Sequence, residues 1–447
     1  MSSDDLAALA ADAYIYGFPL VFDLHEVGRC AHEGMAALTP AGFNAFSHAT
    51  SLAGPEDKFV SVNNDTIYSI AQIDVSGGPL VLSVPDARGR YYVLQYVDAW
   101  TNNFAYVGRR GTGTQAGRFL LVPPGWKHGG DDGAQVIEFP TDVGTIVGRW
   151  ACDGHAELQQ IRALQAATTL EPYPAGGLAP GEPVAAGVPA PTAGTGDLLF
   201  FERLRTWMAA FPPSDTDRAY QQRFAPLGLL EATSPYPSCP PDLAGALSAG
   251  ASAAKQTIEA TLHAGAGLPE VNGWRLTAHM FDYNTDHLGL GTIDDLAWKI
   301  SDRQAAYRAR AIAARGALWG NHGYEAAYPM TYVDGDGHQL DGRNRYTVRF
   351  EQPPPVGAFW SITMYDVPEF HLVANPIGRY SIGDRTPGLR HGDDGSLTIE
   401  IQHERPADSS NWLPAPAAPF RPVLRLYQPS AEVLDGSYQI PPISRVG

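Results

Sequence analysis

The stretch Gly89-Arg90-Tyr91-Tyr92-Val93-Leu94-Gln95-Tyr96-Val97-Asp98 returns in altered form near the C-terminus. There it reads Gly357-Ala358-Phe359-Trp360-Ser361-Ile362-Thr363-Met364-Tyr365-Asp366. At the same offsets, both stretches have a glycine, two aromatic residues, an aliphatic residue, a polar residue and a final aspartate. Aromatic residues are enriched in strands, so each stretch is predicted to be a β-strand. Aromatic strands that end in aspartate turns look alike in general, but the matched offsets favour two copies of one strand.

A second pair of landmarks lies upstream of each stretch. Tyr68 and Asp74 have the same spacing as Tyr328 and Asp334, and an insertion around residues 335–345 follows the second pair. Because both signatures occur in the same order, the sequence predicts a duplicated antiparallel β-sandwich.

Helical sequence precedes and separates the two β blocks. The predicted fold class is therefore α+β and mainly β. It has an N-terminal helical segment (1–50), a first sandwich (51–150), a loop and helical block (151–320) and a second sandwich (321–447). Ser2 caps the first helix, which Gly17 and Pro19 are expected to interrupt. Residues 171–195 are rich in Pro, Gly and Ala and are predicted to form a long loop.

The composition excludes several classes of function. The chain has 447 residues and a formal net charge of −17, which does not favour binding to nucleic acid or to an anionic membrane surface. Its three cysteines lie far apart and form no Cys-x-x-Cys pair, which argues against a disulfide scaffold and a thiolate zinc site.

The N-terminal sequence, Met-Ser-Ser-Asp-Asp, lacks the basic and apolar regions of a signal peptide. No apolar run looks as long as a membrane-spanning helix. We therefore expect a cytoplasmic protein with a small-molecule ligand and no membrane or nucleic-acid partner, and homo-oligomerisation remains open.

The segment Asn63-Asn64-Asp65-Thr66-Ile67-Tyr68 is the densest group of polar side chains before a predicted strand. Loops on rigid strands often carry chemistry, although Asn and Asp also cap turns for local reasons. Asp65, like Asp98 and Asp366, lies among apolar residues. Burial would suit such a carboxyl group to acid–base work, whereas accepting backbone N–H groups would be a structural role.

Other candidates come from residue type and surroundings. His48 is either a proton carrier or a core histidine, and Arg149 could hold an anion or form a salt bridge. Trp360, Tyr365 and Trp412 could stack against a ligand, although aromatic residues in strands are more often core.

No pattern typical of a cofactor or metal site is present. The histidines lack the spacing of a helix-borne zinc site, and no Gly-rich stretch matches a P-loop or dinucleotide fingerprint. Asp282, Asp286 and His287 could hold an ion, but a capping role is the simpler interpretation. We therefore predict no metal and no cofactor.

Several of these stretches resemble a known pair of families. Residues 13–20, 63–68 and 90–98 resemble the domain of unknown function 1254. Residues 358–366, 411–416 and 424–427 resemble its usual companion, the domain of unknown function 1214. The resemblance implies a helical N-terminal part and two β-sandwich units. It does not indicate which reaction, if any, the protein catalyses. The matching motif positions, either chemical or architectural, are His48, Asn63, Asp65, Thr66, Tyr68 and Arg149.

The sequence thus favours a cofactor-free hydrolase or lyase that acts on a small polar or partly aromatic molecule. Asp65 would act as acid or base with His48 or Tyr68 as its partner. The expected substrate-binding residues are Asn63, Thr66, Arg149, Trp360, Tyr365 and Trp412. The alternatives are a non-catalytic protein that binds a carbohydrate or another small ligand, and a metal-dependent enzyme with Asp and His ligands.

Overall fold

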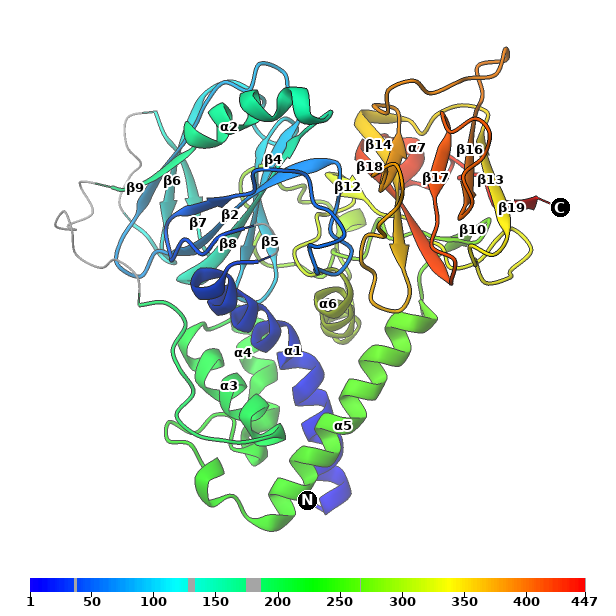
Figure 1. The fold of residues 1–447 in the computed structure, drawn as a ribbon. Coiled ribbons are helices and arrows are strands. Elements are labelled where there is room, and N and C mark those ends of the chain that lie inside the picture. Colours follow the sequence, from blue (N-terminus) through cyan, green and yellow to red (C-terminus); the bar gives the residue numbers. More distant parts are fainter. Residues whose placement is uncertain (36–37, 128–132, 174–185, 266, 447) are drawn as a thin grey trace.

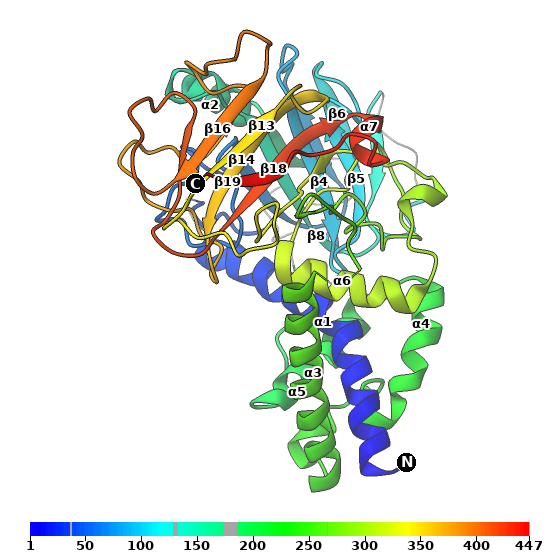
Figure 2. The same ribbon diagram turned by 90° about the vertical axis from the view of Figure 1, so that its right-hand side faces the viewer.

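The structure is a computed structural model that describes residues 1–35, 38–127, 133–173, 186–265 and 267–446. Two β-sandwiches lie side by side, and helices project from beneath them (Figure 1). The view from the side shows α1, α3 and α5 as a stalk and α6 lying across the top of this stalk, under the sheets (Figure 2).

The first sandwich joins a five-stranded sheet, in the order β1-β2-β8-β4-β5, to a four-stranded sheet, β7-β6-β3-β9. Aliphatic and aromatic side chains of both sheets share one buried core. The strands are β1 (Phe46–His48), β2 (Thr66–Asp74), β3 (Leu80–Val84), β4 (Tyr92–Asp98), β5 (Asn103–Gly108), β6 (Gly117–Val122), β7 (Gln135–Glu138), β8 (Val143–Ala151) and β9 (Thr169–Pro172).

The second sandwich joins two four-stranded sheets, β12-β18-β14-β15 and β17-β16-β13-β19. It has a core of its own. The strands are β12 (Ala326–Ala327), β13 (Arg345–Phe350), β14 (Val356–Asp366), β15 (Ser381–Gly383), β16 (Leu397–Gln402), β17 (Trp412–Pro414), β18 (Phe420–Pro429) and β19 (Ile443–Val446).

The two sandwiches are copies of one topology. Each strand from β2 to β9 has a counterpart from β12 to β19 at the same place in the corresponding sheet. The predicted equivalence of residues 89–98 and 357–366 is confirmed, because β4 and β14 occupy matching positions. The other paired strands run antiparallel, as predicted, whereas β6 pairs with β7, and β16 with β17, in parallel.

The strand register extends this equivalence to single residues. On β8, Arg149 is paired with Val93 of β4, and on β18, Arg425 is paired with Ser361 of β14. Val93 and Ser361 stand at the same offset in the two repeated stretches. Arg149 and Arg425 are therefore equivalent residues of the two repeats.

The helix α1 (Ser3–Glu33) is continuous, so the interruption expected at Gly17 and Pro19 does not occur. Packing explains the difference, because Gly17 lets Leu204 of α3 approach so closely that a Cβ atom would lie 2.3 Å from its Cδ1. The remaining helices are α2 (Leu158–Ala166), α3 (Asp197–Ala210), α4 (Asp215–Gln221), α5 (Pro241–Ala264), α6 (Arg303–Ala317) and α7 (Ala431–Leu434), and a short hairpin joins β10 (Glu270–Val271) to β11 (Trp274–Arg275).

By length and composition alone, α1 is long and apolar enough to cross a membrane. The break expected at Gly17 and Pro19 concealed this length. Of its most apolar window, 44% is buried inside the protein, and the core helix of a soluble protein passes the same test. The helix packs against α3, α5 and α6.

The first sandwich extends beyond the expected range of 51–150, because β1 and β9 belong to its sheets. The strand β9 takes up the start of the loop predicted for residues 171–195. Residues 174–185 of that loop lie outside the described residues.

Candidate functional site

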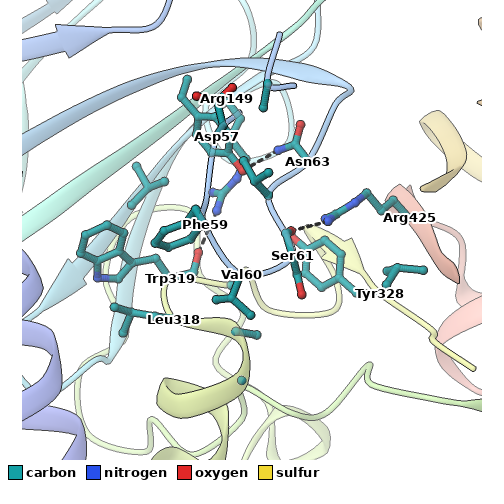
Figure 3. A pocket seen from close by; sticks show the side chains of 18 of the residues that line it. Asp57, Phe59, Val60, Ser61, Asn63, Arg149, Leu318, Trp319, Tyr328 and Arg425 are labelled. Carbon is teal, nitrogen blue, oxygen red and sulfur yellow. Dashed lines mark hydrogen bonds between the residues drawn. The ribbon is translucent and has the colours of Figure 1, made fainter. Parts of the chain in front are cut away.

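A pocket lies between the two sandwiches. Both repeats line it, together with the segment that precedes β2 and the C-terminal end of α6. It holds about 1100 Å³ of empty space, a volume that includes a part open to solvent. The segment with Phe59, Val60 and Ser61 runs between Trp319 on one side and Tyr328 on the other (Figure 3).

Equivalent residues of the two repeats face each other across this pocket. The sequence spacing between Tyr68 and Tyr328 also separates Ile70 from Met330. A second constant spacing relates the wall residues of β8 to those of β18. The matched pairs in the wall are Tyr68 and Tyr328, Ile70 and Met330, Val147 and Val423, and Arg149 and Arg425.

Each repeat contributes a tyrosine covered by an arginine. The guanidinium carbon of Arg149 lies 5.7 Å from the centre of the Tyr68 ring, and that of Arg425 lies 5.5 Å from the centre of Tyr328. Both distances fall in the range of a cation–π interaction.

The two arginines are also held alike from the central strands β4 and β14. Arg149 donates to Gln95 Oε1 at 2.7 Å, and Arg425 donates to Thr363 Oγ1 at 3.3 Å. Gln95 and Thr363 are the matched polar residues of the repeated stretch.

The two phenols are held in a similar way. Asn63 donates its amide N–H to the Tyr68 hydroxyl at 2.7 Å, and Asn321 donates to the Tyr328 hydroxyl at 2.8 Å. Within the described ranges neither hydroxyl has an acceptor for its own proton. Each phenol is therefore available as a donor to a molecule in the pocket.

Three arginines of the wall are buried, with exposed fractions of 7% for Arg149, 3% for Arg421 and 6% for Arg425. Buried charges are normally paired with an opposite charge. In the part of the chain that the structure describes, none of the three has an ion pair.

The partners of these arginines are neutral. Arg149 donates to Trp319 O at 2.8 Å, and Arg425 donates to Ser61 O at 2.6 Å. Arg421 donates to the Ser61 hydroxyl and lies 3.8 Å from the centre of the Phe370 ring, and its Nε has no hydrogen-bond partner among the described residues.

The wall has a positive charge although the whole chain is acidic. Asp57 is the other charged residue among the described lining residues, so three arginines against one aspartate give a net charge of +2. The remaining wall is largely apolar. Its larger apolar members are Met35, Leu38, Phe59, Ile70, Met280, Phe281, Leu318, Trp319 and Met330.

The turn before β2 positions Tyr68. The Oδ1 atom of Asn63 accepts the backbone N–H of Asp65 at 3.0 Å and of Thr66 at 2.9 Å, and the Thr66 hydroxyl at 3.0 Å. Asn63 thus closes the turn with its oxygen and reaches Tyr68 with its nitrogen. Thr66, expected to bind substrate, holds this turn and does not line the pocket.

Asp65 lies beside the pocket and not in its wall. Its carboxylate accepts the hydroxyl of Ser361 at 2.8 Å and that of Tyr427 at 3.2 Å, both from the second repeat. The equivalent residue, Glu325, accepts the hydroxyl of Tyr91 in the first repeat at 2.9 Å. Each repeat therefore uses the carboxylate before its first central strand to bind the other repeat.

His48 is not brought together with Tyr68. On β1 it pairs with Ser69 of β2, and its Nδ1 lies 2.8 Å from the Ser69 hydroxyl. Successive side chains of a strand point to opposite faces. Ser69, which also accepts from Trp150 and Gln165, therefore turns away from the pocket, and His48 with it. Of the three residues expected to act together, Tyr68 lines the pocket, whereas His48 and Asp65 do not.

The three aromatic candidates are core residues. Trp360 and Trp412 are 2% and 0% exposed in the second sandwich and cannot form a wall for a ligand. Tyr365 is also buried, but its hydroxyl accepts from Arg425 and donates to Val62 O, so it positions the arginine and the segment before β2.

The equivalent aspartates Asp98 and Asp366 close turns. Asp98 accepts the backbone N–H groups of Trp100 and Asn102, and Asp366 accepts that of His371. Both therefore have the structural role that the sequence left open.

The possible metal ligands are engaged elsewhere. Asp286 binds Arg303, and Asp282 binds His279, so these aspartates do not gather with His287 around one ion. Among the described residues, Asp334, Asp336 and His338 have ligand atoms within 4.8 Å of one another. Asp334 there accepts the backbone N–H groups of the other two, which is the geometry of a turn.

Sequence reasoning did not select Arg421, Arg425, Tyr328 and Asn321. The signal was present for two of them: Tyr328 is a landmark of the repeat, and Arg425 lies in one of the family stretches. Carrying Arg149 through the repeat would have identified Arg425.

Fold and site together define a duplicated β-sandwich protein with a cationic pocket between its repeats. Residues 43–172 match the family described as protein of unknown function DUF1254, and residues 325–431 match a second one, DUF1214, described in the same words. The chain therefore belongs to the proteins that join these two domains, as the sequence predicted. No curated protein matches it.

One solved structure has a similar fold, and a second matches more weakly. The VPA0106 protein from Vibrio parahaemolyticus matches over 100% of both chains, with a TM-score of 0.70 and 23% identity. A putative uncharacterized protein from Burkholderia cenocepacia matches over 99% of this chain and 94% of its own, with a TM-score of 0.46 and 12% identity, which is too weak to carry an argument.

Proposed function

We propose that the pocket binds a small anionic molecule with an apolar or aromatic part. The observation that carries this proposal is the group of three buried arginines whose partners are all neutral. A carboxylate or a similar anion would supply the missing counter-charge, and guanidinium groups suit such anions geometrically. The apolar wall would enclose the rest of the molecule.

Two hydroxyl donors strengthen the proposal. Tyr68 and Tyr328 each accept from an asparagine and keep their own proton for the pocket. An anion would therefore receive both charge and directed hydrogen bonds.

Thermal unfolding tests the proposal. Small aromatic and aliphatic carboxylates should raise the melting temperature of the protein saturably, whereas their amides, at equal ionic strength, should not. Arg149→Met should reduce the effect, because it removes one of the three cations of the pocket wall. Arg349→Met is the matched control, since Arg349 is half-exposed on β13 and does not line the pocket. Equal effects of acids and amides would contradict the proposal.

Catalysis of the hydrolase or lyase type is a second proposal, with Tyr68 as general acid and Arg149 orienting the substrate. The free hydroxyl proton of Tyr68 supports it. Once a ligand is known, Tyr68→Phe should keep its affinity within about tenfold and lose most of the turnover. Equal turnover in the variant and in the unaltered protein would show that Tyr68 is not the general acid.

A further inference from the structure

We infer that the ligand is a dianion and that each repeat holds one of its two anionic groups. This inference rests on the proposed function and narrows it to one class of ligand. Arg149 and Tyr68 form the first half-site, and Arg425 and Tyr328 form the second.

The duplication places the same two functional groups in each half. Each half-site has a guanidinium group over a tyrosine ring and a phenol whose proton is free. Within the described residues Arg149 Nε and Arg425 Nη1 make no hydrogen bond, and neither arginine has a carboxylate partner. Each arginine therefore keeps an N–H group for a ligand, although the Asp65 carboxylate lies near Arg425.

The half-sites are close enough to act on one small molecule. Burial opposes the charged form of both arginines, yet the pKa of each lies above its usual range, because tyrosines surround both and the Asp65 carboxylate lies near Arg425. Tyr328 is among these tyrosines for Arg149, Tyr68 is among them for Arg425, and Tyr427 contributes to both. Asn321 also joins the two half-sites directly, because its Oδ1 accepts from Arg149 at 3.5 Å and its nitrogen donates to the Tyr328 hydroxyl at 2.8 Å.

The halves differ in charge. Arg421 is paired with Tyr365 of β14, whereas the equivalent place in the first repeat holds Thr145, paired with Val97 of β4. Arg421 therefore adds a cation to the second half-site alone. A dianion with one more strongly acidic group would bind with that group beside Arg421 and Arg425.

Calorimetric titration with unbranched dicarboxylates of increasing chain length, and with their monomethyl esters, tests the inference. The best diacid should bind once per chain and at least about tenfold more tightly than its monoester, because the second contact becomes intramolecular. Arg149→Met and Arg425→Met should each bind the diacid as weakly as the unaltered protein binds the monoester. Arg349→Met should change neither affinity.

Tyr68→Phe and Tyr328→Phe keep the shape of the pocket and serve if an arginine variant does not fold. Each should weaken binding of the diacid by about fivefold. If the monoester binds as tightly as the diacid at every chain length, the dianion inference fails and the anion pocket stands. If neither binds, the proposed function fails as well.

Discussion

Arg149 on β8 and Arg425 on β18 are equivalent residues of the two repeats, and both face one pocket. Each lies over a tyrosine of its own repeat, and each is held by the matched polar residue of the repeated stretch. A duplicated fold has thus produced a site with two similar halves at the interface between the copies.

Arg421 should contribute little to the stability of the ligand-free protein. Its charge is buried and its Nε has no partner in the described part of the chain, so Arg421→Met removes an uncompensated cation while keeping contact with Phe370. We expect the free energy of unfolding in urea to stay unchanged or to rise by about 1 kcal/mol. A loss of more than about 2 kcal/mol would mean that the fold itself needs this charge.

Asp65 should matter for stability and not for ligand binding. Asp65→Asn weakens the hydrogen bonds from Ser361 and Tyr427 that join the repeats, and should lower the free energy of unfolding by about 1–3 kcal/mol. Anion affinity per folded molecule should stay the same or rise slightly, because a negative charge near Arg425 is removed. A large loss of affinity for the anion in a stable Asp65→Asn variant would show that Asp65 takes part in ligand binding.

His322 should make the protein sensitive to acid. Its ring is buried, and its Nδ1 lies 3.0 Å from the hydroxyls of Tyr106 and Tyr324. Burial, and then the nearby Arg110, lowers the pKa of His322 from 6.5 to about 3. The unfolded chain therefore takes up this proton at a higher pH than the folded chain, and stability falls as pH drops below 6.5.

The slope from His322 should approach about 1.4 kcal/mol per pH unit. Burial raises the pKa of Glu325, which gives a slope of opposite sign, so the comparison with a variant isolates the histidine. Urea unfolding of the unaltered protein and of His322→Asn at several pH values measures it. Parallel curves for the two proteins would exclude the histidine as the cause.

Two glycines of α1 provide a matched test of the packing. A Cβ atom at Gly17 would collide with Leu204, so Gly17→Ala should cost about 1–3 kcal/mol of unfolding free energy. At Gly28 no atom lies within 4 Å of an added Cβ, so Gly28→Ala should stabilise the helix by up to about 1 kcal/mol. Equal effects of both changes would show that α1 does not pack on α3 as described.

The sequence revealed the fold through local and repeated patterns. Aromatic strands with matched offsets identified β4 and β14. By contrast, Gly17 and Pro19 led to a wrongly predicted break in α1, because only tertiary packing shows why the helix continues through them. The partners that cross between repeats, such as Asp65 and Tyr427, are distant in sequence, and no spacing rule connects them.

The candidate site was predicted in part for the same reason. Asn63, Tyr68 and Arg149, which the sequence singled out as site residues, all line the pocket, because polar residues at a strand entry and an arginine on a strand are visible in sequence. His48 was misplaced because the face to which a short edge strand turns its side chains depends on its pairing with β2. The arginines of the second repeat needed the register of β18 with β14.

The most direct test of the central claim compares one carboxylate ligand, chosen by thermal shift, in calorimetric titrations of two proteins. The first is the unaltered chain, and the second is the double variant Arg149→Met/Arg425→Met, checked to be folded by circular dichroism. The account predicts saturable binding to the first and binding at least about a hundredfold weaker, roughly 2.7 kcal/mol, to the second. Equal affinity of both proteins for the carboxylate would contradict it.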